Sequence, residues 1–144
     1  MPVAFITGVT GQDGTYLSRA LLDDAYDVHG LVRPDTTSAV PDGVIAHTGD
    51  IRDNARLAEL VAELQPDELY HLAGQTSVGQ SWDDPVGTVE QTGAPIAALL
   101  HAIATRSQHT RVVNASSAEI FGHAEAPQNE ATPIAPVSPY GAAK

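Results

Sequence analysis

The sequence predicts an α/β fold in which a doubly wound parallel sheet is covered by helices on both faces. Short apolar segments alternate with longer amphipathic segments along the chain, and a glycine-rich loop follows the first apolar segment. Strands that alternate with helices through short connections build this type of sheet. The length of 144 residues, with no repeat and no low-complexity tract, suits one domain.

The expected elements follow from the spacing of apolar residues. A short apolar run predicts a buried strand, whereas apolar residues three and four positions apart predict a helix face. Leu57, Leu60 and Val61 show the helical spacing. Asp53 is placed to cap their helix. We expect strands at residues 3–7, 28–32, 44–47, 69–73 and 111–115, helices at 15–25, 53–64 and 96–103, and an irregular connection at 127–139.

Two further residues bear on these elements. Pro95 falls inside a predicted helix, where a proline removes a hydrogen bond and strains the turn. Trp82 lies between the predicted elements and is expected to pack in a loop.

The composition excludes several classes of protein. Hydrophobic residues make up 42% and charged residues 17% of the chain, a balance typical of a globular protein. Cysteine is absent and the histidines show no paired spacing, so we expect no metal site. A formal charge of −11 opposes binding to nucleic acid and to anionic membranes. No run approaches the ~20 apolar residues of a membrane span and no signal peptide is evident, so we expect a cytoplasmic protein.

The segment TGVTGQDG, which follows the first predicted strand, has the features of a phosphate-binding loop. Gly8, Gly11 and Gly14 lie three residues apart, directly before a predicted helix. Glycine permits a tight turn and lets backbone N–H groups approach a pyrophosphate at the helix N-terminus. A purely structural turn is the alternative. The position of the loop between strand and helix favours a Rossmann-like dinucleotide site.

The end of the second predicted strand bears on the choice of dinucleotide. An acidic residue there binds the ribose 2′-hydroxyl of NAD, whereas an arginine accommodates the 2′-phosphate of NADP. Arg33 occupies this position, with Asp35 close by. The alternative is that Arg33 is a solvated loop charge. The sequence therefore favours NADP over NAD as the cofactor.

Tyr140 and Lys144 form a pair with the spacing YxxxK near the end of the chain. Ser138 is a good N-cap and Pro139 suits the first position of a helix. The two side chains are therefore expected on one helix face. There the ammonium of Lys144 would stabilise the phenolate of a tyrosine that acts as a base.

Ser117 and Glu119 follow the fifth predicted strand, at the edge where catalytic residues of open parallel sheets gather. Ser117 can hydrogen-bond a sugar hydroxyl, and Glu119 is a candidate general acid or base. The alternative is a loop serine and glutamate in water.

Together these segments resemble the extended short-chain dehydrogenases/reductases, and within them the GDP-mannose 4,6-dehydratases. The most specific segment is TGVTGQDGTYLS, because its Gln12-Asp13 insert is typical of those dehydratases rather than of the related epimerases. The segments YDVHGLVR, GDIRD, ELYHLAGQTSVGQSWDDP, NASSAEIFG and SPYGAAK are similar too. The resemblance covers essentially the whole chain, but only part of a typical family member.

The resemblance implies a lyase that converts GDP-mannose to GDP-4-keto-6-deoxymannose and recycles NADP internally. It implies that Tyr140 deprotonates the C4 hydroxyl as hydride passes to NADP, and that Lys144 holds the tyrosine and the nicotinamide ribose. It further implies that Glu119 takes the C5 proton and assists loss of water from C6, while Ser117 binds the C4 oxygen. The implied cofactor contacts are Gly8, Thr10, Gly11, Gln12, Asp13, Gly14, Arg33, Asp50, Ile51, Leu72, Ala73 and Gln75.

The chain stops at Lys144, before the sixth strand and the GDP-sugar-binding domain that such proteins carry. We therefore expect residues 1–144 to form the N-terminal part of one NAD(P)-binding domain, with a truncated sheet and no second domain, and to be inactive alone. The resemblance also implies a homo-oligomer.

Two alternatives stay open for the function. One is a non-catalytic NADP-binding fragment. The other is a different extended short-chain dehydrogenase, either a sugar-nucleotide epimerase or another dehydratase. Glu119 favours dehydration over epimerisation, and Gln12-Asp13 favours GDP-mannose as the substrate.

Overall fold

The computed structural model describes all residues from 1 to 144. The chain divides into two compact units, each made of two stretches of sequence. The first unit contains Met1–Gly74 and Pro95–Ala115, and the second contains Gln75–Ala94 and Ser116–Lys144. None of the helices is both long enough and apolar enough to cross a membrane.

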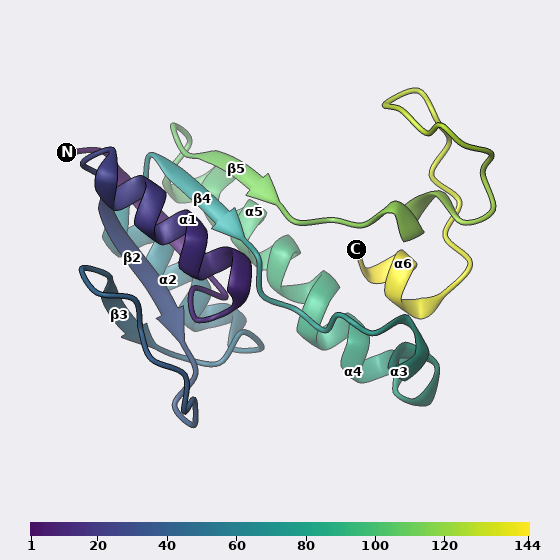
Figure 1. The fold of residues 1–144 in the computed structure, drawn as a ribbon, viewed down its shortest axis with the longest axis horizontal. Coiled ribbons are helices and arrows are strands. Elements are labelled where there is room, and N and C mark those ends of the chain that lie inside the picture. Colours follow the sequence, from purple (N-terminus) through teal and green to yellow (C-terminus); the bar gives the residue numbers. More distant parts are fainter. The chain divides into compact units, whose positions relative to one another are not determined.

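The first unit is built on a five-stranded sheet in which all neighbouring strands are parallel. The strand order is β3-β2-β1-β4-β5, so the chain starts in the middle strand and builds outward in both directions (Figure 1). This order confirms the predicted doubly wound sheet. The strands are β1 (Val3–Thr7), β2 (Asp27–Val32), β3 (Ile45–Thr48), β4 (Glu68–His71) and β5 (Arg111–Asn114).

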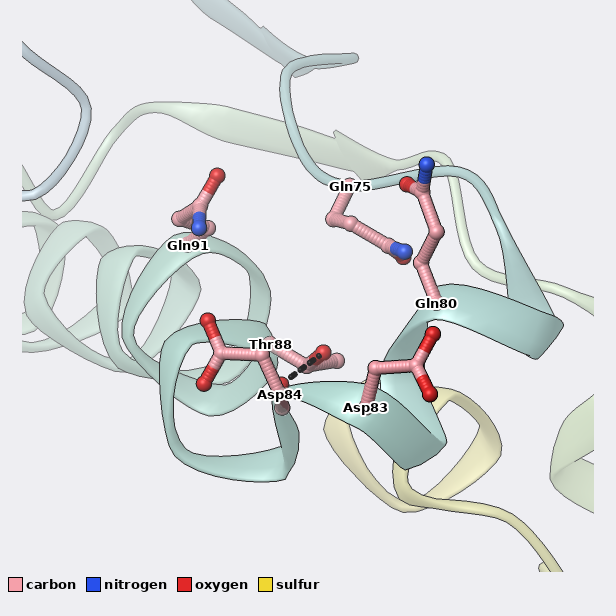
Figure 2. Close-up of a pocket in the computed structure, with 6 residues that line it drawn as sticks. All are labelled: Gln75, Gln80, Asp83, Asp84, Thr88 and Gln91. Atoms are coloured by element: carbon pink, nitrogen blue, oxygen red, sulfur yellow. Dashed lines mark hydrogen bonds between the residues drawn. The ribbon is translucent and has the colours of Figure 1, made fainter.

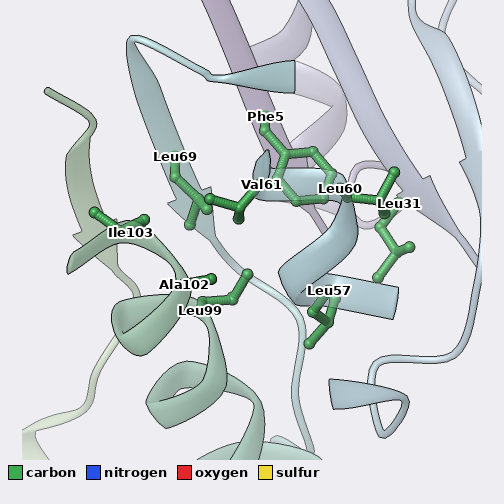
Figure 3. Close-up of a cluster of buried hydrophobic side chains, with 9 residues drawn as sticks. All are labelled: Phe5, Leu31, Leu57, Leu60, Val61, Leu69, Leu99, Ala102 and Ile103. Carbon is green, nitrogen blue, oxygen red and sulfur yellow. The ribbon is translucent and has the colours of Figure 1, made fainter. Parts of the chain in front are cut away.

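The alternation of side chains along β1 separates two hydrophobic clusters. Phe5 belongs to the cluster on one face of the sheet, whereas Ala4 and Ile6 belong to the cluster on the other. Successive strand residues point to opposite faces, so one short apolar strand supplies both. Helices α2 (Asn54–Leu64) and α5 (Ala94–Arg106) cover the first face, and α1 (Gln12–Asp23) covers the second. The first cluster comprises Phe5, Leu31, Leu57, Leu60, Val61, Leu69, Leu99, Ala102 and Ile103 (Figure 3).

The predicted cap of α2 is confirmed, but β4 is shorter at its end than predicted. The Asp53 side chain accepts a hydrogen bond from the Arg56 N–H at 3.0 Å. The strand predicted to run to residue 73 ends at His71. Beyond it the Ala73 N–H turns to the side-chain oxygen of Thr7 at 3.3 Å. Regular pairing stops there because a side chain, not a strand, provides the acceptor.

The second unit contains short helical elements, of which the sequence analysis predicted only the last. Helices α3 (Val78–Asp83) and α4 (Pro85–Thr88) have clear capping groups: Ser77 accepts from the Gln80 N–H, and Asp84 accepts from the Gly87 N–H. Trp82 lies on α3 with 63% of its surface exposed, so the expectation that it packs in a loop is wrong. The elements are α3 (Val78–Asp83), α4 (Pro85–Thr88), the π turn η1 (Val89–Gly93), the 3₁₀ turn η2 (Ala118–Phe121) and α6 (Pro139–Ala143).

The π turn directly precedes Pro95. Its last hydrogen bond runs from the Ala94 N–H to the Val89 carbonyl, five residues back. Pro95 follows within α5 and is buried. Proline cannot donate to the preceding turn, and single π turns are a common irregularity inside helices. The disturbance predicted for Pro95 is therefore seen as a widened turn just before the proline.

Strand β5 forms an open edge of the sheet, and this gives a first prediction. Val113 on this strand is 53% exposed, and Arg111 pairs with Glu68. Uncharged, exposed edge strands template pairing with other chains. We expect residues 1–144 to self-associate through β5 and Val113→Lys to shift them toward monomer, as measured by light scattering. A monomeric unsubstituted protein over the whole concentration range would contradict this.

Candidate functional site

The glycine-rich loop between β1 and α1 has the geometry of a backbone cradle. Gly8 adopts a φ of +78°, a region that favours glycine, and its carbonyl accepts a hydrogen bond from the Gly11 N–H at 3.0 Å. Helix α1 then begins at Gln12 with no side chain capping its N-terminus. The first-turn N–H groups of a helix lack intrahelical partners and favour an anion.

Two of the three glycines are required by close backbone packing. A Cβ on Gly14 would lie 2.3 Å from the Gly8 carbonyl oxygen, and a Cβ on Gly8 would lie 2.9 Å from the Ala73 nitrogen. Gly11 is less crowded, because its Cβ would meet only the Gly8 oxygen at 3.2 Å. The three-residue spacing of the glycines therefore reflects close packing at Gly8 and Gly14 and a turn at Gly11.

Thr7 and His71 tie the loop to the end of β4, and the sequence analysis missed this role. The Thr7 hydroxyl and the His71 Nδ1 atom are 2.8 Å apart and buried. The same hydroxyl accepts from the Ala73 N–H. This arrangement fixes Ala73 against Gly8, where the chain has no room for a side chain. No local sequence pattern signals this contact, because the two residues are 64 positions apart.

The ends of β2 and β3 bring Arg33 close to Asp50. The Gly49 N–H donates to the Val32 carbonyl at 2.9 Å and joins the two strand ends. Arg33 is 70% exposed, and its Nε atom lies 3.8 Å from the Asp35 carboxylate. Ile51, the next predicted contact, packs partly buried against the cluster on the α2 and α5 face.

Asp50 is held by Arg52 through three hydrogen bonds. The Arg52 backbone N–H, Nε and Nη2 donate to the carboxylate at 2.8, 3.0 and 2.6 Å. The side-chain bonds are the largest cause, and the backbone bond the next, of an Asp50 pKa lowered from 3.8 to about 2. The carboxylate is therefore an anion throughout the neutral range. Arg52 was not predicted as a site residue, although it lies in the GDIRD segment.

The Asp50 pKa gives a second prediction. Because the folded state lowers this pKa, the pair stabilises the fold above pH 3.8, and this contribution is lost as the pH falls through about 2. We expect a titration midpoint near 2 in the protein and a return toward 3.8 in Arg52→Gln, followed by NMR of the side-chain carboxyl carbon. A midpoint near 3.8 in the unsubstituted protein would show that the three bonds do not persist in solution.

In the second unit, Tyr140 and Lys144 lie together as predicted. The Ser138 hydroxyl caps α6 by accepting from the Gly141 N–H at 3.0 Å, and Pro139 occupies the first turn. Tyr140 is 8% exposed, and the Lys144 ammonium lies 5.7 Å from the centre of its ring. Burial lowers the pKa of Lys144. The lysine is therefore within range to act on the tyrosine by charge.

Glu119 lies on the 3₁₀ turn η2, and Ser117 directly precedes this turn, which packs against α6. Ser117 caps the turn by accepting from the Glu119 N–H at 3.2 Å. The contact with α6 is close, because a Cβ on Gly141 would lie 2.5 Å from the Glu119 carbonyl oxygen. All four predicted catalytic residues thus lie on, or directly beside, two packed elements of the same unit.

The remaining predicted contacts are divided between the units. Thr10, Gln12 and Asp13 lie in or beside the loop before α1, with Gln12 and Asp13 exposed. Leu72 and Ala73 follow β4 in the first unit, whereas Gln75 belongs to the second.

Gln75 borders an open pocket of about 320 Å³ in the second unit (Figure 2). The side chains around it offer amide groups, a hydroxyl and two carboxylates, which suit a ligand rich in hydroxyl groups and disfavour a phosphate. The sequence analysis missed this pocket because it did not predict α3 and α4. The lining residues are Gln75, Gln80, Asp83, Asp84, Thr88 and Gln91.

Comparison with known proteins places these features in one family. The sequence model of the family described as GDP-mannose 4,6 dehydratase matches residues 5–144. The chain belongs to this family. A GDP-mannose 4,6-dehydratase of Sordaria araneosa is 41% identical over 150 residues, which cover 98% of this chain and 28% of that protein. One from Yersinia enterocolitica is 40% identical over 160 residues, which cover 100% of this chain and 43% of that protein.

The solved structures confirm the Rossmann-like fold of this dehydratase-family chain. A UDP-glucose 4-epimerase of Thermus thermophilus, solved in complex with NAD, has a TM-score of 0.85 and 30% identity. The match covers 99% of this chain and 47% of the epimerase. The chain thus spans less than half the length of these curated and solved relatives.

Proposed function

We propose that the protein is a GDP-mannose 4,6-dehydratase, and that residues 1–144 supply its dinucleotide site and its proton-transfer residues. The observation that carries this is the grouping of Ser117, Glu119, Tyr140 and Lys144 on, or directly beside, two packed elements, η2 and α6. These are the groups needed to bind a sugar hydroxyl, remove its proton and assist loss of water.

The residues of the first unit fit a dinucleotide. Gly8 and Gly14 leave backbone exposed where a Cβ would clash, and no side chain occupies the N-terminus of α1. Such a loop accepts a pyrophosphate. The bound dinucleotide would accept a hydride from the sugar and return it later. We propose the contacts Gly8, Thr10, Gly11, Gln12, Asp13, Gly14, Arg33, Asp50, Ile51, Leu72, Ala73 and Gln75.

Tyr140 would take the proton of the C4 hydroxyl as that carbon is oxidised to a ketone. The Lys144 ammonium stabilises the phenolate that accepts this proton, and the Ser117 hydroxyl donates to the C4 oxygen. The 4-keto group acidifies the proton on C5. Glu119 would remove that proton and transfer it to the departing C6 hydroxyl, which leaves as water. As the hydride returns to C6, C5 would take up a proton, for which the proton accepted by Tyr140 is the source.

We propose NADP rather than NAD as the cofactor, because Arg33 follows β2 at the position that decides between them. Its single ion pair, at 3.8 Å to Asp35, leaves it largely exposed and able to contact a 2′-phosphate. We also propose that residues 1–144 are the N-terminal part of one dinucleotide-binding domain and that the protein acts as a homo-oligomer.

The test uses a chimaera in which residues 1–144 replace the matching part of the Yersinia enterocolitica dehydratase. We expect it to convert GDP-mannose to a 4-keto sugar that has lost one water, as detected by mass spectrometry. Residues 1–144 alone should not convert GDP-mannose, because they correspond to only 43% of that relative's length. A folded chimaera that binds dinucleotide but leaves GDP-mannose unchanged would contradict the proposal that GDP-mannose is the substrate.

A sugar-nucleotide epimerase is the second candidate. The 30% identity to the Thermus thermophilus UDP-glucose 4-epimerase favours it. It predicts a product of unchanged mass that is inverted at C4, so mass spectrometry of the chimaera reaction detects dehydration and NMR of the recovered sugar detects inversion.

A further inference from the structure

The ion pair between Arg52 and Asp50 lies next to the proposed ribose end of the dinucleotide site. Asp50 and Arg52 follow β3, and Arg33 follows the neighbouring strand β2. The Gly49 N–H bond to the Val32 carbonyl holds these strand ends together. Arg33 also acts on Asp50 by charge, being one of the causes of its lowered pKa.

This position raises an electrostatic problem for a phosphorylated ribose. Two carboxylates, Asp35 and Asp50, lie near Arg33, in a chain with a formal charge of −11. An unpaired carboxylate beside Arg33 would repel a 2′-phosphate and would compete with it for the arginine.

Arg52 removes much of that problem for Asp50. It engages both carboxylate oxygens with its guanidinium and adds a backbone bond, which is the strong bidentate form of this interaction. The Arg33 pair with Asp35 is different in kind. It is a single contact at 3.8 Å between side chains that are 70% and 82% exposed, so water screens it.

We propose that Arg52 determines specificity for the phosphorylated dinucleotide: by pairing with Asp50 it cancels that charge and leaves Arg33 available for the ribose 2′-phosphate. Arg52 is a positioning residue here and does not itself contact the phosphate. This inference rests on the proposed function, namely that the first unit binds a dinucleotide.

The experiment titrates NADP and NAD into the protein, into Arg52→Gln, and into Arg52→Gln combined with Asp50→Asn, by calorimetry. NADP and NAD differ only in the 2′-phosphate, so the ratio of their affinities cancels any shared loss. We expect Arg52→Gln to lower the NADP preference about tenfold, the size expected of one unit charge acting across a few ångströms at a partly exposed site. The double variant removes the carboxylate charge and should restore the preference.

Arg56→Gln is the matched control, because this arginine pairs with Glu59 and Glu63 on α2 rather than with Asp50. It should leave the ratio unchanged. Equal losses of affinity for NADP and for NAD in Arg52→Gln would overturn the inference. Arg52 would then affect only the binding of the part of the molecule that both cofactors have in common. A preference that stays low in the double variant would also overturn it, since Arg52 would then contact the phosphate directly. If the unsubstituted protein bound neither dinucleotide, the proposed function itself would fail, and the inference with it.

Discussion

Replacing Gly14 with alanine should abolish dinucleotide binding and lower the free energy of unfolding by about 3 kcal/mol, the upper part of the range for overpacking. The new Cβ would lie 2.3 Å from the Gly8 carbonyl oxygen and 2.7 Å from the Val9 Cα, both backbone atoms that cannot move aside separately. Relief requires the loop to shift, and this would displace the N–H groups proposed to bind the pyrophosphate. Urea unfolding and calorimetric titration with NADP measure the two effects.

Two other glycines are the controls for this prediction. Gly11→Ala places its Cβ 3.2 Å from one oxygen and should cost little stability. Gly79→Ala on α3 meets only the Ser77 hydroxyl at 3.9 Å and should be neutral or mildly stabilising. Full NADP affinity in Gly14→Ala would show that the loop does not bind the pyrophosphate in this conformation.

Replacing Tyr140 with phenylalanine should lower turnover of GDP-mannose by the chimaera about 10³-fold, within the range for a lost general base. The ring would remain, 8% exposed and close to the Lys144 ammonium, so the fold and the affinity for NADP should change little. A turnover assay paired with NADP titration separates the chemical step from cofactor binding.

Tyr16→Phe is the matched control, because it removes the hydroxyl of a tyrosine that is 63% exposed on α1. Turnover should be unaffected by this change. If Tyr140→Phe kept full activity, the proton on the C4 hydroxyl would have to leave by another residue, and the role proposed for α6 would be wrong.

Local patterns in the sequence predicted local structure well. Asp53 and Ser138 were recognised as caps because an N-cap needs only its own side chain and an N–H two or three residues away. The alternation around Phe5 likewise places one strand between two clusters. Tyr140 and Lys144 were expected to meet because helix geometry alone brings such a pair together.

Contacts between distant segments were not predictable in this way. Thr7 and His71 are 64 positions apart, and no local sequence pattern predicts the hydrogen bond that joins the glycine-rich loop to β4. The Arg52 pair with Asp50 is local, but the role proposed for it depends on Arg33, which only the pairing of β2 with β3 brings near. Helices α3 and α4 are too short to show an apolar period, so the pocket they border was missed as well.

The most direct test of the account follows the hydrogen on C4 of the sugar. The chimaera is given GDP-mannose that carries deuterium at C4, and NMR locates the deuterium in the product. If the hydride is taken from C4 and returned after water has left C6, the deuterium must appear at C6 of a 4-keto-6-deoxy sugar, and Tyr140→Phe must suppress its transfer. Deuterium at C4 of a product that is inverted at C4 and has kept its C6 hydroxyl would identify an epimerase and contradict the proposed dehydration.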